Sequence, residues 1–169
     1  MKVIGISGWS GTGKTTLLVK LIPELIKRGY SVSSLKHAHH KFDVDKPGKD
    51  SYRHREAGAR EVMVASAARW ALMHENQTDD EPALDELIQH MTPVDILLVE
   101  GFKREDFPKI EVWRNDENGL ALHLTDDSIV AVATNNKDLQ TTLPVLELDD
   151  PENIAEFIER RFLTEGPAA

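Results

Sequence analysis

A glycine-rich run near the start of the chain has the residue types and spacing of a phosphate-binding loop. Residues 8–15 read GWSGTGKT, which matches G-x-x-x-x-G-K-[ST] at every fixed position. In such a loop the backbone N–H groups surround phosphate oxygens, and the positive end of the following helix adds to the attraction. We expect Lys14 to reach the β- and γ-phosphates of a nucleoside triphosphate and the Thr15 hydroxyl to bind Mg²⁺.

The flanking residues supply the context that this loop requires. Residues 2–7 (KVIGIS) form a short apolar run that predicts a buried strand. After the loop, apolar residues recur at helical spacing as far as Ile26, Pro23 is expected to bend this helix, and Gly29 is expected to end it. A chance match in a glycine-rich turn is the alternative, and the strand before and helix after the loop disfavour it.

A second part of the site is expected at the carboxyl end of another strand, because ligands of parallel sheets bind there. Residues 95–99 (DILLV) predict a buried strand, and Glu100 and Gly101 follow it. We expect Glu100 to hold Mg²⁺ through water or to orient an attacking water, since the metal needs an oxygen ligand beyond Thr15. The alternative is that Glu100 merely ends the strand.

Residues 33–51 (SSLKHAHHKFDVDKPGKDS) contain three histidines, four lysines and three aspartates. We expect a mobile loop that closes on anionic groups, because a local basic cluster attracts phosphates to an otherwise acidic chain. A solvated loop is one alternative, and a metal site on His37 and His39 with Asp43 or Asp45 is another. The expected donors to anions are Lys36, His37, Lys46 and Lys49, and Asp45 or Asp50 is expected to face Mg²⁺.

The order of the remaining patterns predicts an α/β fold with a mostly parallel sheet flanked by helices. A second, less apolar strand is expected at 31–36 and a further buried strand at 129–134. Further helices are expected at 49–58, at 84–91 with Asp79 or Asp80 as its cap, and after Pro151. Two peripheral β-hairpins are expected, one joining 61–66 to 69–74 and one joining 109–114 to 120–125 around NDENG. Trp70 and Trp113 lie on these expected strands and are interpreted as packing residues, and Trp9 is expected to pack on the loop or a neighbour.

The later hairpin is expected to serve assembly. Ile110 and Val112 alternate against Leu120, Leu122 and Leu124. A two-stranded ribbon alone is marginally stable in water, so its apolar face needs cover from its own sheet or from a second subunit.

The composition limits the possible classes of partner. We expect a single nucleotide-binding domain over residues 1–163 and a frayed tail at 164–169. The formal net charge of −9 disfavours nucleic acid and anionic membranes as partners. The chain has no cysteine, which excludes disulfides and thiolate metal sites and suits the cytoplasm. No signal peptide is expected, and no apolar run approaches the ~20 residues of a spanning helix.

Several segments taken together resemble the MobB family, the molybdopterin-guanine dinucleotide biosynthesis protein B family. The phosphate loop is common to many families, whereas the histidine-rich loop and the VEGFK segment are far more specific in combination. The resemblance runs through most of the chain and thins after about Lys109. The segments are GWSGTGKTTLL, LKHAHH, DVDKPGKDSYRHREAGA, RWALM and LLVEGFK.

The resemblance implies a P-loop GTP-binding protein with weak GTPase activity, acting as a homodimer beside the enzyme that attaches GMP to molybdopterin. Molybdopterin or its guanine dinucleotide is a further candidate ligand. The chain departs from standard GTPases because residues 136–139 (NKDL) put Leu139 where a guanine-reading aspartate is expected. Asn135 is the substitute we expect, with a simple turn residue as the alternative. The implied nucleotide contacts are Ser10, Gly11, Thr12, Gly13, Lys14, Thr15 and Thr16, with Glu100 on the Mg²⁺ side.

Two other classes of function fit the phosphate loop. One is a small-molecule kinase that uses ATP, and the other is a non-catalytic docking module that the nucleotide switches. Kinases commonly carry an arginine-rich mobile lid, but Arg53, Arg55 and Arg60 are spaced along an expected helix and are interpreted as a solvated face. Fast ATP consumption that depends on a small acceptor would favour the kinase.

Overall fold

The computed structural model describes residues 1–38, 42–78, 80–114 and 120–163. The chain forms two compact units. The first comprises residues 1–37 and 91–169, and the second comprises residues 38–90, which lie between these two ranges in the sequence. The single domain predicted over residues 1–163 stays a prediction. The part of the chain described here contains no helix long and apolar enough to cross a membrane.

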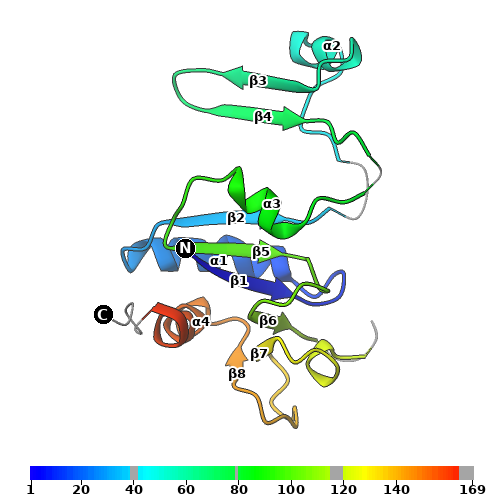
Figure 1. Ribbon diagram of the computed structural model, residues 1–169. Helices are drawn as coiled ribbons and strands as arrows, with labels where there is room; N and C mark the ends of the chain where they lie inside the picture. The colour runs from blue at the N-terminus through cyan, green and yellow to red at the C-terminus, as the bar shows by residue number, and fades with distance from the viewer. Residues whose placement is uncertain (39–41, 79, 115–119, 164–169) are drawn as a thin grey trace, which may run out of the picture. The chain divides into compact units, whose positions relative to one another are not determined.

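The first unit is built on a parallel sheet of six strands in the order β2-β5-β1-β6-β7-β8 (Figure 1). Every pairing in this sheet is parallel, which confirms the predicted α/β class. The strands are β1 Lys2–Ser7, β2 Val32–Lys36, β5 Ile96–Glu100, β6 Lys109–Val112, β7 Ile129–Thr134 and β8 Val145–Glu147. The strand β8 was not predicted.

Two helices bury their apolar stripes against the sheet. Helix α1 (Lys14–Lys27) and helix α4 (Pro151–Ile158) contribute to one core with strands β1, β5, β6 and β7. Gly29 follows Arg28, the C-cap of α1, and adopts φ +95°, as its predicted role as the helix stop requires. The Asp150 side chain accepts a hydrogen bond from the Asn153 N–H and caps α4, which a short π-helix (Glu159–Leu163) continues.

The predicted hairpin over residues 109–125 is wrong. Strand β6 lies inside the sheet between β1 and β7, parallel to both, and Leu122–Leu124 is a 3-10 helix. The charged residues that alternate with Ile110 and Val112 in this strand, Lys109 and Glu111, are both buried, as a strand inside the sheet requires. The NDENG segment at 115–119 lies outside the described residues, as does the tail at 164–169.

The second unit contains the helices α2 (Asp50–Glu56) and α3 (Leu84–Gln89) and the antiparallel strands β3 (Glu61–Ala65) and β4 (Trp70–His74). The earlier predicted hairpin is therefore confirmed. Ala83 occupies the N-cap position of α3, so the cap predicted at Asp80 is wrong, and Asp79 lies outside the described residues.

Two side chains of the second unit differ from their predicted surroundings. Arg55 was expected on a solvated face, but its guanidinium lies 2.7 Å from an Asp43 carboxylate oxygen and 5.1 Å from the centre of the Tyr52 ring. Trp70 was expected to pack, but 63% of it is exposed. Trp113, in the first unit, is buried as expected.

Candidate functional site

The phosphate loop joins the end of β1 to the start of α1. All three of its glycines have backbone conformations that other residues rarely adopt, with φ +142° at Gly8, +81° at Gly11 and +102° at Gly13. A Cβ atom on Gly8 would also lie 2.4 Å from the Val112 carbonyl oxygen, so the loop can run beside β6 only because this residue is glycine. Helix α1 begins at Lys14, so the free N–H groups of its first turn lie at the loop.

The residues predicted to contact the phosphates differ in their exposure to solvent. Ser10, Gly11, Thr15 and Thr16 are exposed, as contact with a phosphate chain requires. Thr12 is buried, and its hydroxyl donates a hydrogen bond to the Trp9 carbonyl oxygen at 2.9 Å. The Thr12 side chain therefore stabilises the conformation of the loop.

The Lys14 ammonium lies over the loop. It donates to the carbonyl oxygens of Gly8 and Trp9 at 3.0 and 2.8 Å. Burial lowers the pKa of Lys14; the negative charge of Glu100 opposes this shift, and the positive charge of Lys103 adds to it. The loop thus concentrates positive charge where a polyphosphate would neutralise it.

Thr15 and Glu100 come together at the predicted metal position. The Thr15 hydroxyl donates to a Glu100 carboxylate oxygen at 3.1 Å, and the Lys36 ammonium lies 3.8 Å from the same oxygen. Strands β5 and β1 are adjacent and parallel, so the end of β5 delivers Glu100 beside the start of α1. A hydroxyl and a carboxylate are the oxygen ligands that Mg²⁺ prefers, so these residues fit the ion, which would neutralise charge on the phosphates when bound.

The histidine-rich segment divides between the two units. His37 belongs to the first unit. Its backbone N–H donates to the Glu100 carbonyl oxygen at 2.8 Å, and the centre of its ring lies 4.6 Å from the centre of the Phe102 ring. Gly101 permits this contact, because a Cβ atom there would lie 2.6 Å from the Cβ atom of His37. Lys36 and His37 therefore flank Glu100, and their predicted role as donors to anionic groups stays a prediction.

Asp45, Lys46 and Lys49 belong to the second unit, and their predicted roles stay predictions. The Asp45 carboxylate accepts from the Ser51 hydroxyl at 2.8 Å and from the Lys46 N–H at 3.0 Å. His39 lies outside the described residues. Among the residues that are described, no three histidine or acidic side chains gather as metal ligands.

A cavity of about 540 Å³ lies at the ends of β6 and β7. The Asn135 side chain donates to an Asp149 carboxylate oxygen at 2.6 Å, and the Nε of Arg114 donates to the Thr12 carbonyl oxygen at 2.9 Å. Arg114 therefore links this cavity to the phosphate loop. The cavity is lined by Arg114, Thr134, Asn135, Asn136, Lys137 and Asp138.

Two residues beside the loop were missed by sequence reasoning. Arg114 follows a strand that was placed in a hairpin, so its position next to the loop could not be foreseen. Lys103 lies in the VEGFK segment, and its ammonium is 4.2 Å from the centre of the Trp9 ring. The Trp9 indole N–H donates to the Leu120 carbonyl oxygen at 2.9 Å, so Trp9 packs on neighbours as expected.

The all-parallel sheet, with a glycine-rich phosphate loop between β1 and α1, defines a P-loop NTPase-like fold. The family model of MobB, Molybdopterin guanine dinucleotide synthesis protein B, matches residues 3–135, and the chain belongs to this family.

The similarity to individual proteins extends over nearly the whole chain. The chain is 48% identical over 159 residues to a molybdopterin-guanine dinucleotide biosynthesis adapter protein of Haemophilus influenzae, covering 93% of this chain and 87% of that protein. It is 43% identical over 158 residues to the Escherichia coli adapter protein of the same description, covering 92% and 90%. A crystal structure of molybdopterin-guanine biosynthesis protein B is similar with a TM-score of 0.75 and 26% identity, covering 94% of this chain and 98% of that one.

Proposed function

We propose that this protein binds GTP and Mg²⁺ at its phosphate loop, hydrolyses the nucleotide slowly, and acts as an adapter in the synthesis of molybdopterin guanine dinucleotide. The observation that carries the proposal is the pairing of Thr15 with Glu100 at the start of α1, at 3.1 Å, in a chain whose relatives are described as adapter proteins. The loop supplies backbone N–H groups and Lys14 to the phosphates, and Thr15 and Glu100 supply oxygen atoms to the ion.

Several features support the finer parts of this proposal. The cavity beside Arg114 and Asn135 lies at the carboxyl ends of β6 and β7, where a nucleotide in the loop would extend its base. The proposed preference for guanine over other bases rests on membership of the MobB family. Glu100 lies where it could orient an attacking water, and slow turnover suits a protein that acts through a partner. A chain without cysteine also suits the cytoplasm.

The proposed partner is the guanylyltransferase that attaches GMP to molybdopterin. The test is the rate at which that enzyme forms the guanine dinucleotide, measured with and without this protein in the presence of GTP and Mg²⁺. We expect the parent protein to increase the rate and the Lys14→Ala variant to have no effect. An equal increase by both proteins would show that nucleotide binding at the loop plays no part in the adapter function.

The Thr15–Glu100 pair gives a test of the metal site. Glu100→Gln keeps the shape of the side chain and removes the charge that attracts Mg²⁺. We expect the gain in GTP affinity on adding Mg²⁺ to fall about tenfold, with affinity in the presence of a chelator unchanged. Glu105→Gln, at an exposed position nearby in sequence, is the matched control. If Glu100→Gln and the parent have the same Mg²⁺ titration and hydrolysis rate, Glu100 only ends its strand.

We also propose that the protein is a homodimer that uses the ribbon formed by β3 and β4. Met63 pairs with Leu72 and Ala65 with Trp70 in this antiparallel ribbon, so these side chains share one face. Met63, Leu72 and Trp70 are 60, 40 and 63% exposed. An apolar face on a two-stranded ribbon needs cover, and a second copy of the chain would supply it.

A charge on this ribbon face is expected to separate the subunits. Leu72→Glu would bury a carboxylate in the proposed interface without an opposite charge, so we expect the monomer mass in sedimentation at micromolar concentration. Val19→Glu introduces the same change at an exposed residue of α1 and is expected to stay dimeric. A parent protein that is monomeric with and without nucleotide would contradict the dimer, and a dimeric Leu72→Glu variant would contradict this interface.

A further inference from the structure

Lys103 lies on a sharp turn that follows Glu100 at the end of β5. Gly101 has φ +102° and Phe102 has φ +48°, which is the only positive value at a non-glycine residue in the described ranges. Phe102 is buried and packs on the ring of His37, so the turn is held by packing. Such conformations persist only where the surrounding structure imposes them, and they cluster at ligand-binding segments.

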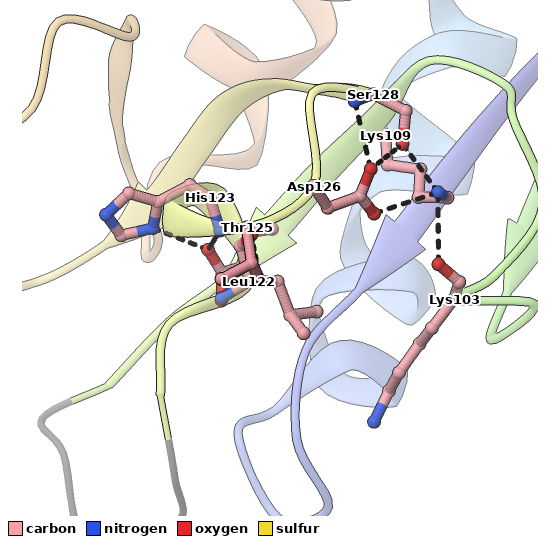
Figure 2. A network of polar contacts seen from close by, with 8 residues as sticks. Lys103, Lys109, Leu122, His123, Thr125, Asp126 and Ser128 are labelled. Atoms are coloured by element: carbon pink, nitrogen blue, oxygen red, sulfur yellow. Dashed lines mark hydrogen bonds and ion pairs between the residues drawn. The ribbon is translucent and has the colours of Figure 1, made fainter.

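A buried polar network fixes the backbone of Lys103. The Lys109 ammonium donates to the Lys103 carbonyl oxygen at 3.2 Å, to an Asp126 carboxylate oxygen at 3.0 Å, and to the Ser128 hydroxyl (Figure 2). Lys109 is buried, whereas the side chain of Lys103 extends away from this network. The network therefore fixes the backbone of Lys103, and the ammonium at the end of its side chain lies outside the network.

The ammonium of Lys103 contacts the phosphate loop at Trp9. It lies 4.2 Å from the centre of the Trp9 ring, and Trp9 is the second residue of the loop. The Lys14 ammonium donates to the Trp9 carbonyl oxygen at 2.8 Å, so two cations lie at this one loop residue and repel each other. A cation held on an aromatic face beside a second cation would be more stable with an anionic group between them.

The sheet order indicates which phosphate would be nearest. The cavity for the base lies at the ends of β6 and β7, on one side of β1, and Thr15 and Glu100 meet on the β5 side of β1. A nucleotide that spans the loop from the base cavity therefore directs its terminal phosphate toward the end of β5. Lys103 follows β5 in sequence, and its ammonium lies at Trp9, whose carbonyl oxygen accepts from Lys14, the residue expected at the β- and γ-phosphates.

We propose that Lys103 is a phosphate-binding residue that leaves the Trp9 ring and pairs with the terminal phosphate of the nucleotide. The inference rests on the proposed binding of GTP and adds to it a residue that distinguishes the triphosphate from the diphosphate. An ammonium–phosphate hydrogen bond with charge on both partners is stronger than a cation–π contact near the surface. The movement therefore occurs only when the terminal phosphate is present.

The test compares the dissociation constants of a non-hydrolysable GTP analogue and of GDP, both with Mg²⁺, by calorimetry. We expect Lys103→Ala to weaken binding of the analogue at least about tenfold and binding of GDP less than about threefold. Lys103→Arg keeps the charge and is expected to retain most of the preference for the triphosphate. Lys27→Ala, which removes an exposed lysine at the end of α1, is expected to bind both ligands like the parent.

The outcomes separate this inference from the proposed function. If the parent binds neither ligand, the proposed function and the role of Lys103 are both wrong. If the parent binds both ligands and Lys103→Ala changes neither dissociation constant, or changes both by the same factor, GTP binding stands and the role of Lys103 is overturned.

Discussion

Replacing Lys14 with alanine is expected to abolish nucleotide binding while leaving the fold intact. The ammonium lies over the loop, 2.8 to 3.0 Å from two loop carbonyl oxygens, in position to meet the phosphates. A charge-assisted hydrogen bond contributes about 1.5–3 kcal/mol. Losing two such bonds from the Lys14 ammonium to the phosphates lowers the affinity for GTP by roughly two to four orders of magnitude. Calorimetry with GTP and Mg²⁺ measures this loss.

The fold should tolerate this change because the charge of Lys14 is unfavourable in the loop without ligand. Its folded-state pKa is below the unfolded value, mainly through burial, so the unfolded chain binds the proton more tightly. The unfavourable contribution is present below the folded-state pKa and disappears as the pH rises toward the unfolded value. We therefore expect an unfolding temperature for Lys14→Ala at neutral pH that is equal to or above that of the parent.

A matched control comes from the same helix. Lys20 is exposed on α1, so Lys20→Ala changes the net charge equally without touching the loop. The control is expected to bind GTP like the parent. Equal GTP affinity in Lys14→Ala and the parent would contradict the assignment of the loop.

Removing the carboxylate of Asp126 is expected to destabilise the fold strongly. Lys109 is 1% exposed, and its ammonium lies 3.0 Å from an Asp126 carboxylate oxygen. Asp126→Ala leaves this buried positive charge without its counter-charge, and breaking a buried pair in this way costs about 3–5 kcal/mol. Urea unfolding, followed by circular dichroism, measures the change in the free energy of unfolding.

The two partners should differ in their effects. Lys109→Met removes the buried charge and fills similar space, and it leaves Asp126, which is 24% exposed, accessible to water. We therefore expect Lys109→Met to destabilise the fold less than Asp126→Ala. Equal stability of Asp126→Ala and the parent would show that the pair contributes nothing to folding.

The pH dependence of stability provides a second readout for this pair. Burial tends to raise the pKa of Asp126, but hydrogen bonds from Ser128 and Lys109 outweigh it and hold this pKa below its usual value. A carboxyl group with a lowered folded-state pKa contributes stability that is present above its unfolded pKa of about 3.9 and lost as the pH falls through the folded value. This loss between the two values should be absent from Asp126→Ala.

The central parts of the site could be predicted because they depend on local sequence. The glycines of GWSGTGKT specify the turn, and the apolar runs at 2–7 and 95–99 have the length and composition of buried strands, which the structure confirms as β1 and β5. Glu100 ends its strand beside Thr15 as expected, because the carboxyl ends of parallel strands lie at one edge.

The errors come from charges whose partners are distant in sequence. The alternation in residues 109–114 predicts one strand of a peripheral hairpin around NDENG. In the folded chain Glu111 is buried and accepts from the ring and the N–H of His123, and Lys109 pairs with Asp126. These partners neutralise or satisfy the buried groups, and no local pattern reveals them. The positions of Arg114 and Lys103 depend on the same misplaced strand and its network.

The most direct test of the central claim is calorimetric titration of the parent protein with GTP and with ATP, each in the presence of Mg²⁺. We predict one GTP bound per chain, with an affinity higher than that for ATP and lower when a chelator removes the metal. Absence of GTP binding, or binding of ATP at least as tight as that of GTP, would contradict the account.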